Sequence, residues 1–272
     1  MVAPDVDRFF AGSIPQLYEQ YLVPLIFEPY AADLAARVAL RNPSSVLEIA
    51  AGTGVVTRRL ASALAPPVAI LATDLNQAML DQAASVGTSR PVEWRQADAT
   101  QLPFADESFD VVVCQFGVMF FPDKPKAFSE ARRVLRPGGA FIFNLWDGIE
   151  QNEFAQVVTL ALEPLFPLDP PRFLARVPHG FGDTALVARQ LSDGGFARDP
   201  EVVVLAQRSR AASPDIPAIA YCQGTPLRSE IEARGPSRLL EATDAAAAAI
   251  RDRFGHGAVD GKIQAHIITV AR

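Results

Sequence analysis

The first half of the chain alternates short strand-like segments with longer segments that have apolar residues at helical spacing. The strand-like segments lie at 46–50, 68–73, 92–96, 110–115 and 140–146. The helical segments between them lie at 54–64, 76–85 and 124–135. Because strands and helices alternate, the pattern predicts a parallel sheet with helices on both faces, joined by right-handed crossovers.

The pattern is less regular before the first strand and after the fifth. The apolar spacing over 15–40 predicts helices that Pro24 and Pro29 break. The second half is expected to hold helices at 150–166 and 183–192, a proline- and glycine-rich surface loop at 168–183, strands at 201–208 and 263–270, and a mostly helical insertion at 210–260.

The first strand runs into a glycine-rich turn, Ala50-Ala51-Gly52-Thr53-Gly54, and a helix opens directly after it. Glycine permits left-handed backbone and removes side chains that would keep a ligand away. A helix N-terminus beside such a turn can hold a polar ligand with backbone N–H groups. Asp74 follows at the spacing of about twenty residues that places a carboxylate on a ribose in nucleotide-binding sheets. We therefore expect an adenosine-containing cofactor.

Two residues around the turn, Thr57 and Glu48, indicate which cofactor. A dinucleotide fingerprint needs a small residue where this chain has Thr57, and no Gly-Lys-Ser/Thr follows the turn as in a phosphate loop. Glu48 lies inside the strand, and a carboxylate there would repel a pyrophosphate but suit a ligand with a positive charge and an amine. This combination favours S-adenosylmethionine. As alternatives, Glu48 could cap the turn and Asp74 could be the N-cap of the next helix.

Four further segments follow the Glu48-x-Ala50-x-Gly52-x-Gly54 pattern in order. They are Ala72-Thr73-Asp74-Leu75-Asn76, Gln96-Ala97-Asp98-Ala99 leading into Leu102-Pro103-Phe104, Phe109-Asp110-Val111-Val112-Val113, and Arg133-Val134-Leu135-Arg136-Pro137-Gly138-Gly139. As a set, they resemble the class I S-adenosylmethionine-dependent methyltransferases. They are most similar to the small-molecule branch that includes the ubiquinone/menaquinone-biosynthesis methyltransferases. The resemblance covers about 46–146.

The resemblance implies a doubly wound, Rossmann-like α/β fold with a helical cap. Its seven-stranded, mostly parallel sheet is expected in the order 3-2-1-4-5-7-6, with the last strand antiparallel. We expect an N-terminal helical cap segment at 1–40, the methyltransferase core at 41–209 and 262–272, and a helical insertion near the acceptor site at 210–261.

The resemblance also implies which residues hold the cofactor. The expected contacts are Glu48 near the methionine amine; the backbone of Ala50, Gly52, Thr53 and Gly54 along the methionine portion; Asp74 on the ribose hydroxyls; Leu75 and Met79 flanking the adenine; Asp98 accepting from the adenine amine, with Ala99 nearby; Gln115 and Phe116 in the crevice after the fourth strand; and Tyr18 and Tyr21 closing over the cofactor. As alternatives, Asp98 could hold a local turn, and Phe116 and both tyrosines could be core residues.

Methyl transfer from a sulfonium depends mainly on holding donor and nucleophile in line and excluding water, so no catalytic residue need be evident. His179 is the best candidate for a base, and the alternative is an ordinary loop histidine. The segment after the fourth strand, Cys114-Gln115-Phe116-Gly117, lacks the Asn/Asp-Pro-Pro-aromatic motif of enzymes that methylate nucleic-acid amines. We therefore expect a small, partly apolar acceptor with an oxygen or carbon nucleophile.

Composition narrows the remaining choices. The net charge of −6 gives no footprint for nucleic acid, and no apolar run reaches the eighteen residues of a membrane span. Charges near the N-terminus and two distant cysteines favour a reduced, cytoplasmic protein. No His or Cys cluster has metal-ligand spacing. The alternatives are an NAD-dependent oxidoreductase, which Glu48 and Thr57 disfavour, and a non-catalytic S-adenosylmethionine-binding module.

Overall fold

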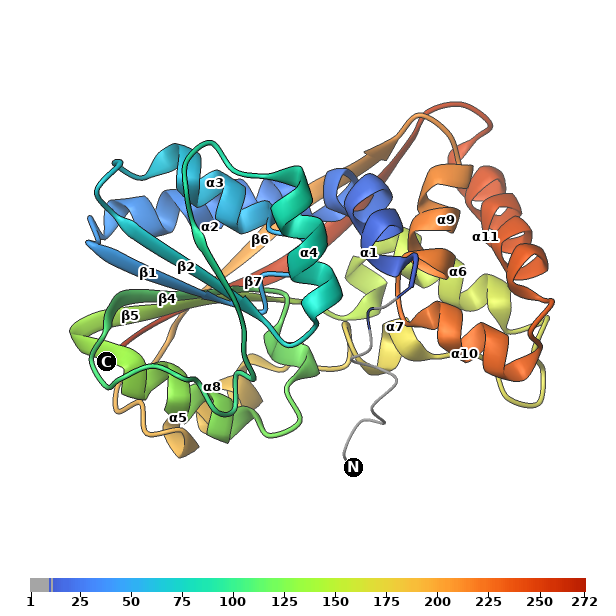
Figure 1. The fold of residues 1–272 in the computed structure, drawn as a ribbon. Coiled ribbons are helices and arrows are strands. Elements are labelled where there is room, and N and C mark those ends of the chain that lie inside the picture. Colours follow the sequence, from blue (N-terminus) through green and yellow to red (C-terminus); the bar gives the residue numbers. More distant parts are fainter. Residues whose placement is uncertain (1–9, 11) are drawn as a thin grey trace. The chain divides into compact units, whose positions relative to one another are not determined.

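The computed structural model describes Phe10 and residues 12–272, which group into two compact units (Figure 1). The sheet unit comprises Pro29–Leu145, Asp183–Leu205 and His266–Arg272. The helical unit comprises the described residues up to Glu28, together with Trp146–Gly182 and Ala206–Ala265. None of the described helices has both the length and the apolar character that crossing a bilayer requires.

Seven strands form one sheet in the order β3-β2-β1-β4-β5-β7-β6, with β7 antiparallel and the others mostly parallel. The strands are β1 (Ser45–Ile49), β2 (Ala69–Asp74), β3 (Glu93–Gln96), β4 (Phe109–Gln115), β5 (Leu135–Trp146), β6 (Glu201–Ala211) and β7 (Val259–Ala271). The order and the antiparallel strand confirm the prediction. β1 pairs with both β2 and β4, so the direction of winding reverses between β1 and β4, where open α/β sheets place their ligand crevice.

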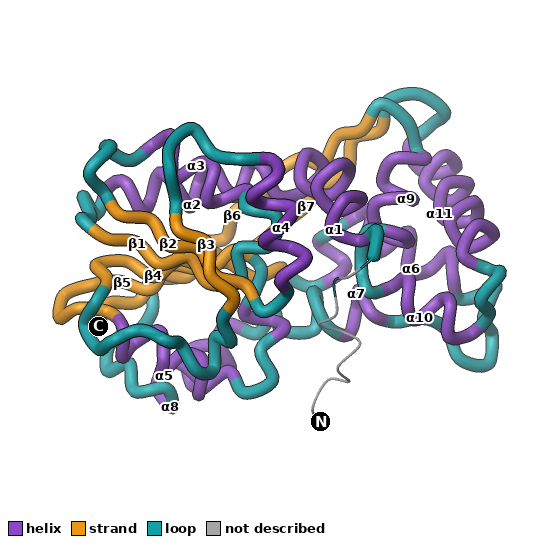
Figure 2. Tube along the Cα trace, viewed as in Figure 1, coloured by secondary structure: helices purple, strands orange, loops and turns teal. Residues whose placement is uncertain are grey.

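Helices flank the strands of the sheet unit, and the helical unit consists mainly of helices (Figure 2). Those mainly of the sheet unit are α2 (Glu28–Leu40), α3 (Val55–Ala63), α4 (Gln77–Val86), the short 3₁₀ turn η3 (Val118–Phe120), α5 (Lys124–Val134) and α8 (Thr184–Asp193). Those of the helical unit are α1 (Ile14–Leu17), the π-helix η2 (Tyr18–Phe27), the 3₁₀ turn η4 (Ile149–Gln151), α6 (Glu153–Leu162), α7 (Phe173–Arg176), α9 (Asp215–Gln223), α10 (Leu227–Arg234) and α11 (Leu239–Phe254). The last three confirm the helical character predicted between β6 and β7.

Aromatic side chains fix helices on the two faces of the sheet unit. Phe128 of α5 lies against Phe141 and Phe143 of β5, with ring centroids 5.9 and 5.7 Å away. Tyr30 of α2 meets the Phe116 ring edge-on at 5.2 Å, and its hydroxyl donates to the Leu205 carbonyl over 3.1 Å. Accordingly, α2 and α5 cover opposite faces of the sheet (Figure 1).

Several predicted boundaries are wrong. The helices over 15–40 are not broken at Pro24, which lies inside the π-helix, because π spacing relieves the clash of the proline ring with the preceding turn. Pro29 lies in the first turn of α2, which follows η2 without a gap, so it does not end the helix either. β5 begins at Leu135, earlier than predicted, since an irregularity in its pairing with β4 accommodates the Arg136-Pro137-Gly138-Gly139 segment. The loop predicted at 168–183 contains α7.

Candidate cofactor site

The turn after β1 has the left-handed backbone that its glycines allow. Ala50, Gly52 and Gly54 have φ values of 54°, 57° and 83°. A Cβ on Gly54 would lie 2.8 Å from the Trp94 indole and 3.1 Å from Cβ of Ala83, so this glycine lets the start of α3 pack closely. The contacts that a side chain would make at Gly54 are with protein side chains, which gives this glycine a packing reason. A backbone contact with the cofactor there stays a prediction.

Glu48 is a buried acid at the centre of the sheet. Only 1% of it is exposed, and the Thr57 hydroxyl of α3 donates to Oε2 over 2.6 Å. Burial raises the pKa of Glu48 to about 8, against the lowering effect of this hydrogen bond. This bond explains why a threonine, rather than a small residue, occupies position 57. It also places the carboxyl group toward α3.

Asp74 joins the carboxyl ends of β1 and β2. Its Oδ2 accepts from the Gly52 N–H over 2.8 Å, and Oδ1 accepts from the Asn76 N–H over 2.8 Å. Burial raises the pKa of Asp74 against these backbone bonds. The N-cap of α4 is Asn76, so Asp74 fixes the turn before the helix rather than capping it. A carboxylate has about four lone-pair sites, and the ribose assignment requires one that these bonds do not use.

The loops after β1 and β4 meet at the point where the winding reverses. A Cβ on Gly117 would lie 2.5 Å from Cβ of Ala50 and 2.7 Å from Sγ of Cys114, so only glycine fits between them. Phe116 has a left-handed φ of 49°, and its N–H donates to Oδ1 of the buried Asn144 on β5 over 2.8 Å. The Phe116 ring is buried against α2, as the core alternative expects. Its contact with the cofactor, like that of Gln115, stays a prediction.

The segment predicted to hold adenine follows β3. Asp98 Oδ1 accepts from both the N–H and the hydroxyl of Thr100, over 2.8 and 2.7 Å, so Asp98 does hold a local turn. The Ala97 N–H donates to the Asp74 carbonyl over 3.0 Å, which ties the segment to β2. Leu75 is 43% exposed, an unusual position for a leucine, whereas Met79 is buried in α4. The adenine roles of these residues and of Ala99 remain predictions.

The acceptor groups at these strand ends fit S-adenosylmethionine. Two buried carboxylates, Glu48 and Asp74, lie at the ends of β1 and β2. In the turn between them, the buried Thr53 hydroxyl has no hydrogen-bond partner among the described residues. Acidic and acceptor-rich surroundings suit an ammonium group, a sulfonium and ribose hydroxyls, whereas they would repel the pyrophosphate of NAD.

The three remaining candidates belong to the helical unit. Tyr18 stacks on Phe27 with ring centroids 5.0 Å apart, as its core alternative expects, and Tyr21 is half-buried. His179 Nδ1 lies 3.0 Å from the Asp147 carbonyl, and burial lowers the pKa of the imidazole to about 4. The ring is therefore neutral, with its Nδ1–H donating and Nε2 left as the acceptor. Roles for these residues in binding or catalysis remain predictions.

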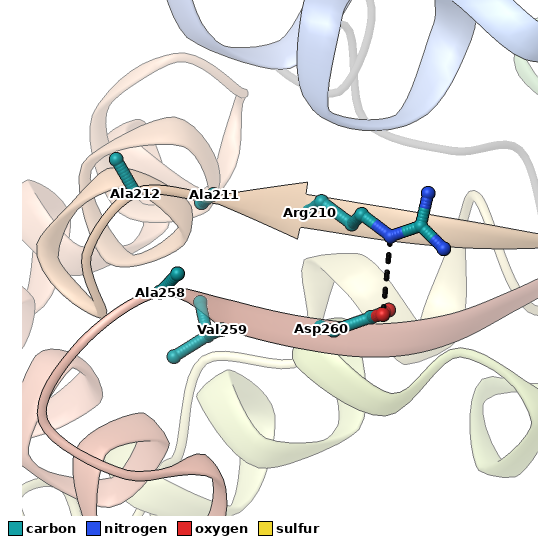
Figure 3. Close-up of a pocket in the computed structure, with 6 residues that line it drawn as sticks. All are labelled: Arg210, Ala211, Ala212, Ala258, Val259 and Asp260. Carbon is teal, nitrogen blue, oxygen red and sulfur yellow. Dashed lines mark hydrogen bonds and ion pairs between the residues drawn. The ribbon is translucent and has the colours of Figure 1, made fainter.

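Other features of the described residues involve none of the predicted site residues. A shallow hollow between the ends of β6 and β7 contains the Arg210–Asp260 ion pair, at 3.1 Å, and none of the predicted residues (Figure 3). Within the described part of the chain, no group of three His, Cys, Asp or Glu side chains could hold a metal ion.

Sequence reasoning missed Gly117 and Asn144. A glycine soon after a strand and an asparagine in an otherwise apolar strand were the available signals.

Comparison with known proteins identifies the family. The family described as "Methyltransferase domain" matches residues 47–143. The ubiquinone/menaquinone biosynthesis C-methyltransferase UbiE of Ectopseudomonas mendocina is 32% identical over 206 residues, which cover 71% of this chain and 76% of that protein. The oxidoreductase alternative finds no support in these matches.

Solved structures share the fold at lower identity. The YcgJ protein from Bacillus subtilis is 19% identical with a TM-score of 0.56, covering 90% of this chain and 98% of its own. Phosphoethanolamine N-methyltransferase 2 from Haemonchus contortus is 18% identical with a TM-score of 0.60, covering 98% of this chain and 59% of its own. The chain therefore belongs to the class I S-adenosylmethionine-dependent methyltransferases, and S-adenosylmethionine is its cofactor.

Proposed function

We propose that this methyltransferase acts on a small, partly apolar acceptor through an oxygen or carbon nucleophile. The observation that carries the proposal is the similarity to relatives named as ubiquinone/menaquinone biosynthesis C-methyltransferases, which extends over 71% of the chain. The Cys114-Gln115-Phe116-Gly117 segment supports it, because it lacks the motif of amine-methylating enzymes of nucleic acids. Among the two nucleophiles, the names of these relatives favour carbon on a quinone-related ring.

The proposal assigns the acidic end of the sheet to cofactor binding. Glu48 faces the methionine amine, Asp74 accepts from the ribose hydroxyls, and Asp98 accepts from the adenine amine. The Thr53 hydroxyl, which is buried, donates to or accepts from the methionine portion. Leu75, exposed at the end of β2, covers one face of the adenine. S-adenosylmethionine supplies an electrophilic methyl group on a positively charged sulfur, and these residues hold it in one orientation.

Protonation of Glu48 is part of this assignment. With a pKa of about 8, the carboxyl group is mostly protonated at neutral pH when no cation faces it. A positive charge nearby favours the ionised form. Glu48 therefore releases a proton when it takes up the methionine ammonium, and Thr57 keeps its hydrogen bond to Oε2 throughout.

The remaining proton transfer belongs to the acceptor. An oxygen nucleophile, or a carbon activated by a neighbouring hydroxyl, loses a proton during or before transfer. In the neutral tautomer set by the Asp147 carbonyl, His179 has an acceptor at Nε2, so it is the candidate base. Positioning and water exclusion account for the rest of the rate.

An acceptor screen tests the proposal. The full chain is incubated with S-adenosylmethionine carrying a labelled methyl group and with matched phenols, hydroquinones and primary amines. We expect label in a phenolic or hydroquinone product, and much less of it with the Asp74→Ala variant at limiting S-adenosylmethionine. Transfer to amines alone would contradict the proposal while leaving the family assignment intact.

A further inference from the structure

The loop between β3 and β4 is held by two side chains of α5. Arg133 and Glu130 form a fork-to-fork ion pair, with Nε to Oε1 and Nη2 to Oε2 both at 2.8 Å. Arg133 also donates to the carbonyls of Leu102 and Phe104, over 2.9 and 2.7 Å, and to the Asp106 carboxylate over 2.8 Å. Glu130 accepts from the Leu102 N–H over 2.8 Å. We call Arg133 and Glu130, with these bonds, the α5 clamp.

The α5 clamp uses properties that arginine has and lysine lacks. A loop without a strand partner must satisfy its backbone groups in another way. The planar guanidinium offers five donors in fixed directions, so one side chain can serve two carbonyls and two carboxylates together. Hydrogen bonds from Arg133 lower the pKa of Glu130, which keeps this buried acid ionised and the fork intact.

The α5 clamp acts directly next to Asp98. The Gln101 N–H donates to the Asp98 carbonyl over 3.0 Å, and these two residues form an isolated antiparallel bridge. Asp98 to Gln101 is therefore a closed turn. Ala97 anchors it on one side through the Asp74 carbonyl, and Leu102, which is 4% exposed, anchors it on the other through both its N–H and its carbonyl.

We propose that Arg133 is a positioning residue for recognition of the adenine amine. It holds Leu102, and through Leu102 the turn that presents the Asp98 carboxylate. This inference rests on the proposed role of Asp98. It adds that selectivity for the six-amino group depends on a side chain of α5 that itself makes no contact with the cofactor. A variant that lacks Arg133 therefore still folds, but its binding preference for adenine over the six-oxo analogue is weaker.

Arg136 provides a matched control three residues along the chain. Its guanidinium also bonds a carboxylate, Asp110, over 2.7 Å, and it reaches the Ser45 hydroxyl over 3.2 Å. These partners lie at the amino ends of β1 and β4, away from the turn that contains Asp98. The Arg136→Gln variant therefore removes a comparable ion pair of the same unit without releasing the adenine segment.

The test is calorimetric titration of the full chain with S-adenosylhomocysteine and with S-inosylhomocysteine, in which oxygen replaces the adenine amine. We expect the wild type to prefer the adenine compound by about tenfold or more, as for a hydrogen bond to a charged group. Arg133→Gln should bring that preference to within about twofold, Arg133→Lys should restore it only in part, and Arg136→Gln should leave it unchanged.

Thermal unfolding of each variant accompanies the titrations. Where Arg133→Gln proves unfolded, Glu130→Gln replaces it, since the amide oxygen can still accept from Leu102 while the fork is weakened. An unchanged preference in a folded clamp variant would overturn the proposal and show that the clamp is only structural. A wild type that binds both compounds equally would overturn it as well. A wild type that binds neither would instead contradict the cofactor assignment itself.

Discussion

The pKa values of the carboxyl groups shift in opposite directions at the two ends of the central strands. At the carboxyl ends, burial raises the pKa of Glu48 to about 8 and also raises the pKa of Asp74. At the amino ends of β1 and β4, burial acts to raise the pKa of Asp110, but hydrogen bonds from Ser44 and Arg136 outweigh it and lower the pKa. The same residue chemistry therefore has opposite protonation tendencies within one sheet.

This difference indicates that Asp110 serves folding stability, whereas Glu48 serves ligand binding. Asp110 bonds the Ser44 hydroxyl over 2.6 Å and Arg136 over 2.7 Å, so its charge contributes to folding. Glu48 is satisfied by one hydroxyl, and its charged form is unfavourable in the unliganded protein. A fold retains a buried acid of this kind where a ligand supplies the missing positive charge. The carboxyl ends of the central strands are thus suited to bind a cation, whereas the carboxylate at their amino ends stabilises the fold.

The largest effect on cofactor binding is expected when valine replaces a glycine at the carboxyl ends of the strands, and the matched change at the amino ends is its control. Gly52 and Gly138 both have left-handed backbone, with φ of 57° and 83°. Valine is strained at either position, by about 1–3 kcal/mol. Gly52→Val should abolish S-adenosylmethionine binding in calorimetry, because it also distorts the turn between the two acids. Gly138→Val has open space around its Cβ and should lose stability only. Binding by a folded Gly52→Val variant would show that the turn does not approach the cofactor.

The next effect concerns stability and pH at Glu48. A raised pKa in the folded state means that stability is greatest below about pH 4.5 and is lost as the pH rises through about 8. Glu48→Gln removes this loss, so the variant should gain on the wild type between pH 5 and 8.5, by at most about 5 kcal/mol. Denaturant unfolding at several pH values measures the difference. A difference that does not change with pH would contradict the raised pKa.

Asp74 should show a smaller effect on binding. Asp74→Ala removes the acceptor for the ribose hydroxyls and should weaken S-adenosylmethionine binding by about 10–100-fold, the value of hydrogen bonds to a charged group. The matched change at the other end, Asp110→Ala, should lower the unfolding temperature without changing affinity. Unchanged affinity in Asp74→Ala would remove the ribose assignment.

The smallest effect is expected at His179, which belongs to neither end of the sheet. His179→Ala should leave S-adenosylmethionine affinity within about twofold of the wild type, since the ring bonds the Asp147 carbonyl. A lower kcat at unchanged affinity would identify His179 as the base, and a normal kcat would exclude it. A large loss of affinity would contradict a role for His179 in proton transfer alone.

Regular features with a clear local cause were predictable from the sequence. The strand order followed from the family resemblance, and the turn after β1 followed from its glycines. The sequence did not explain why position 57 is threonine and not a small residue. The structure explains it, because the Thr57 hydroxyl donates to Glu48, nine positions earlier in the chain. The extension of β5 and the uninterrupted helix at Pro24 depend on tertiary pairing and on π spacing, which local propensity does not encode.

Contacts between distant segments were beyond sequence reasoning. Arg133 holds a loop some thirty residues earlier, and Arg136 holds the start of β1. Neither contact follows from the local sequence around these arginines. Likewise, the Gly117–Ala50 contact requires knowledge of which strand ends are neighbours. Such contacts position the residues of the site. The kind of ligand that Glu48 and Asp74 suit could be predicted from their residue type and spacing.

The most direct test of the central claim is calorimetric titration of the full chain with S-adenosylmethionine, S-adenosylhomocysteine and NAD. The acidic carboxyl end of the sheet predicts saturable binding of the first two, with proton release at neutral pH, and no binding of NAD. Binding of NAD alone, or of none of the three, would contradict the claim that this end of the sheet is built for a cationic adenosine cofactor.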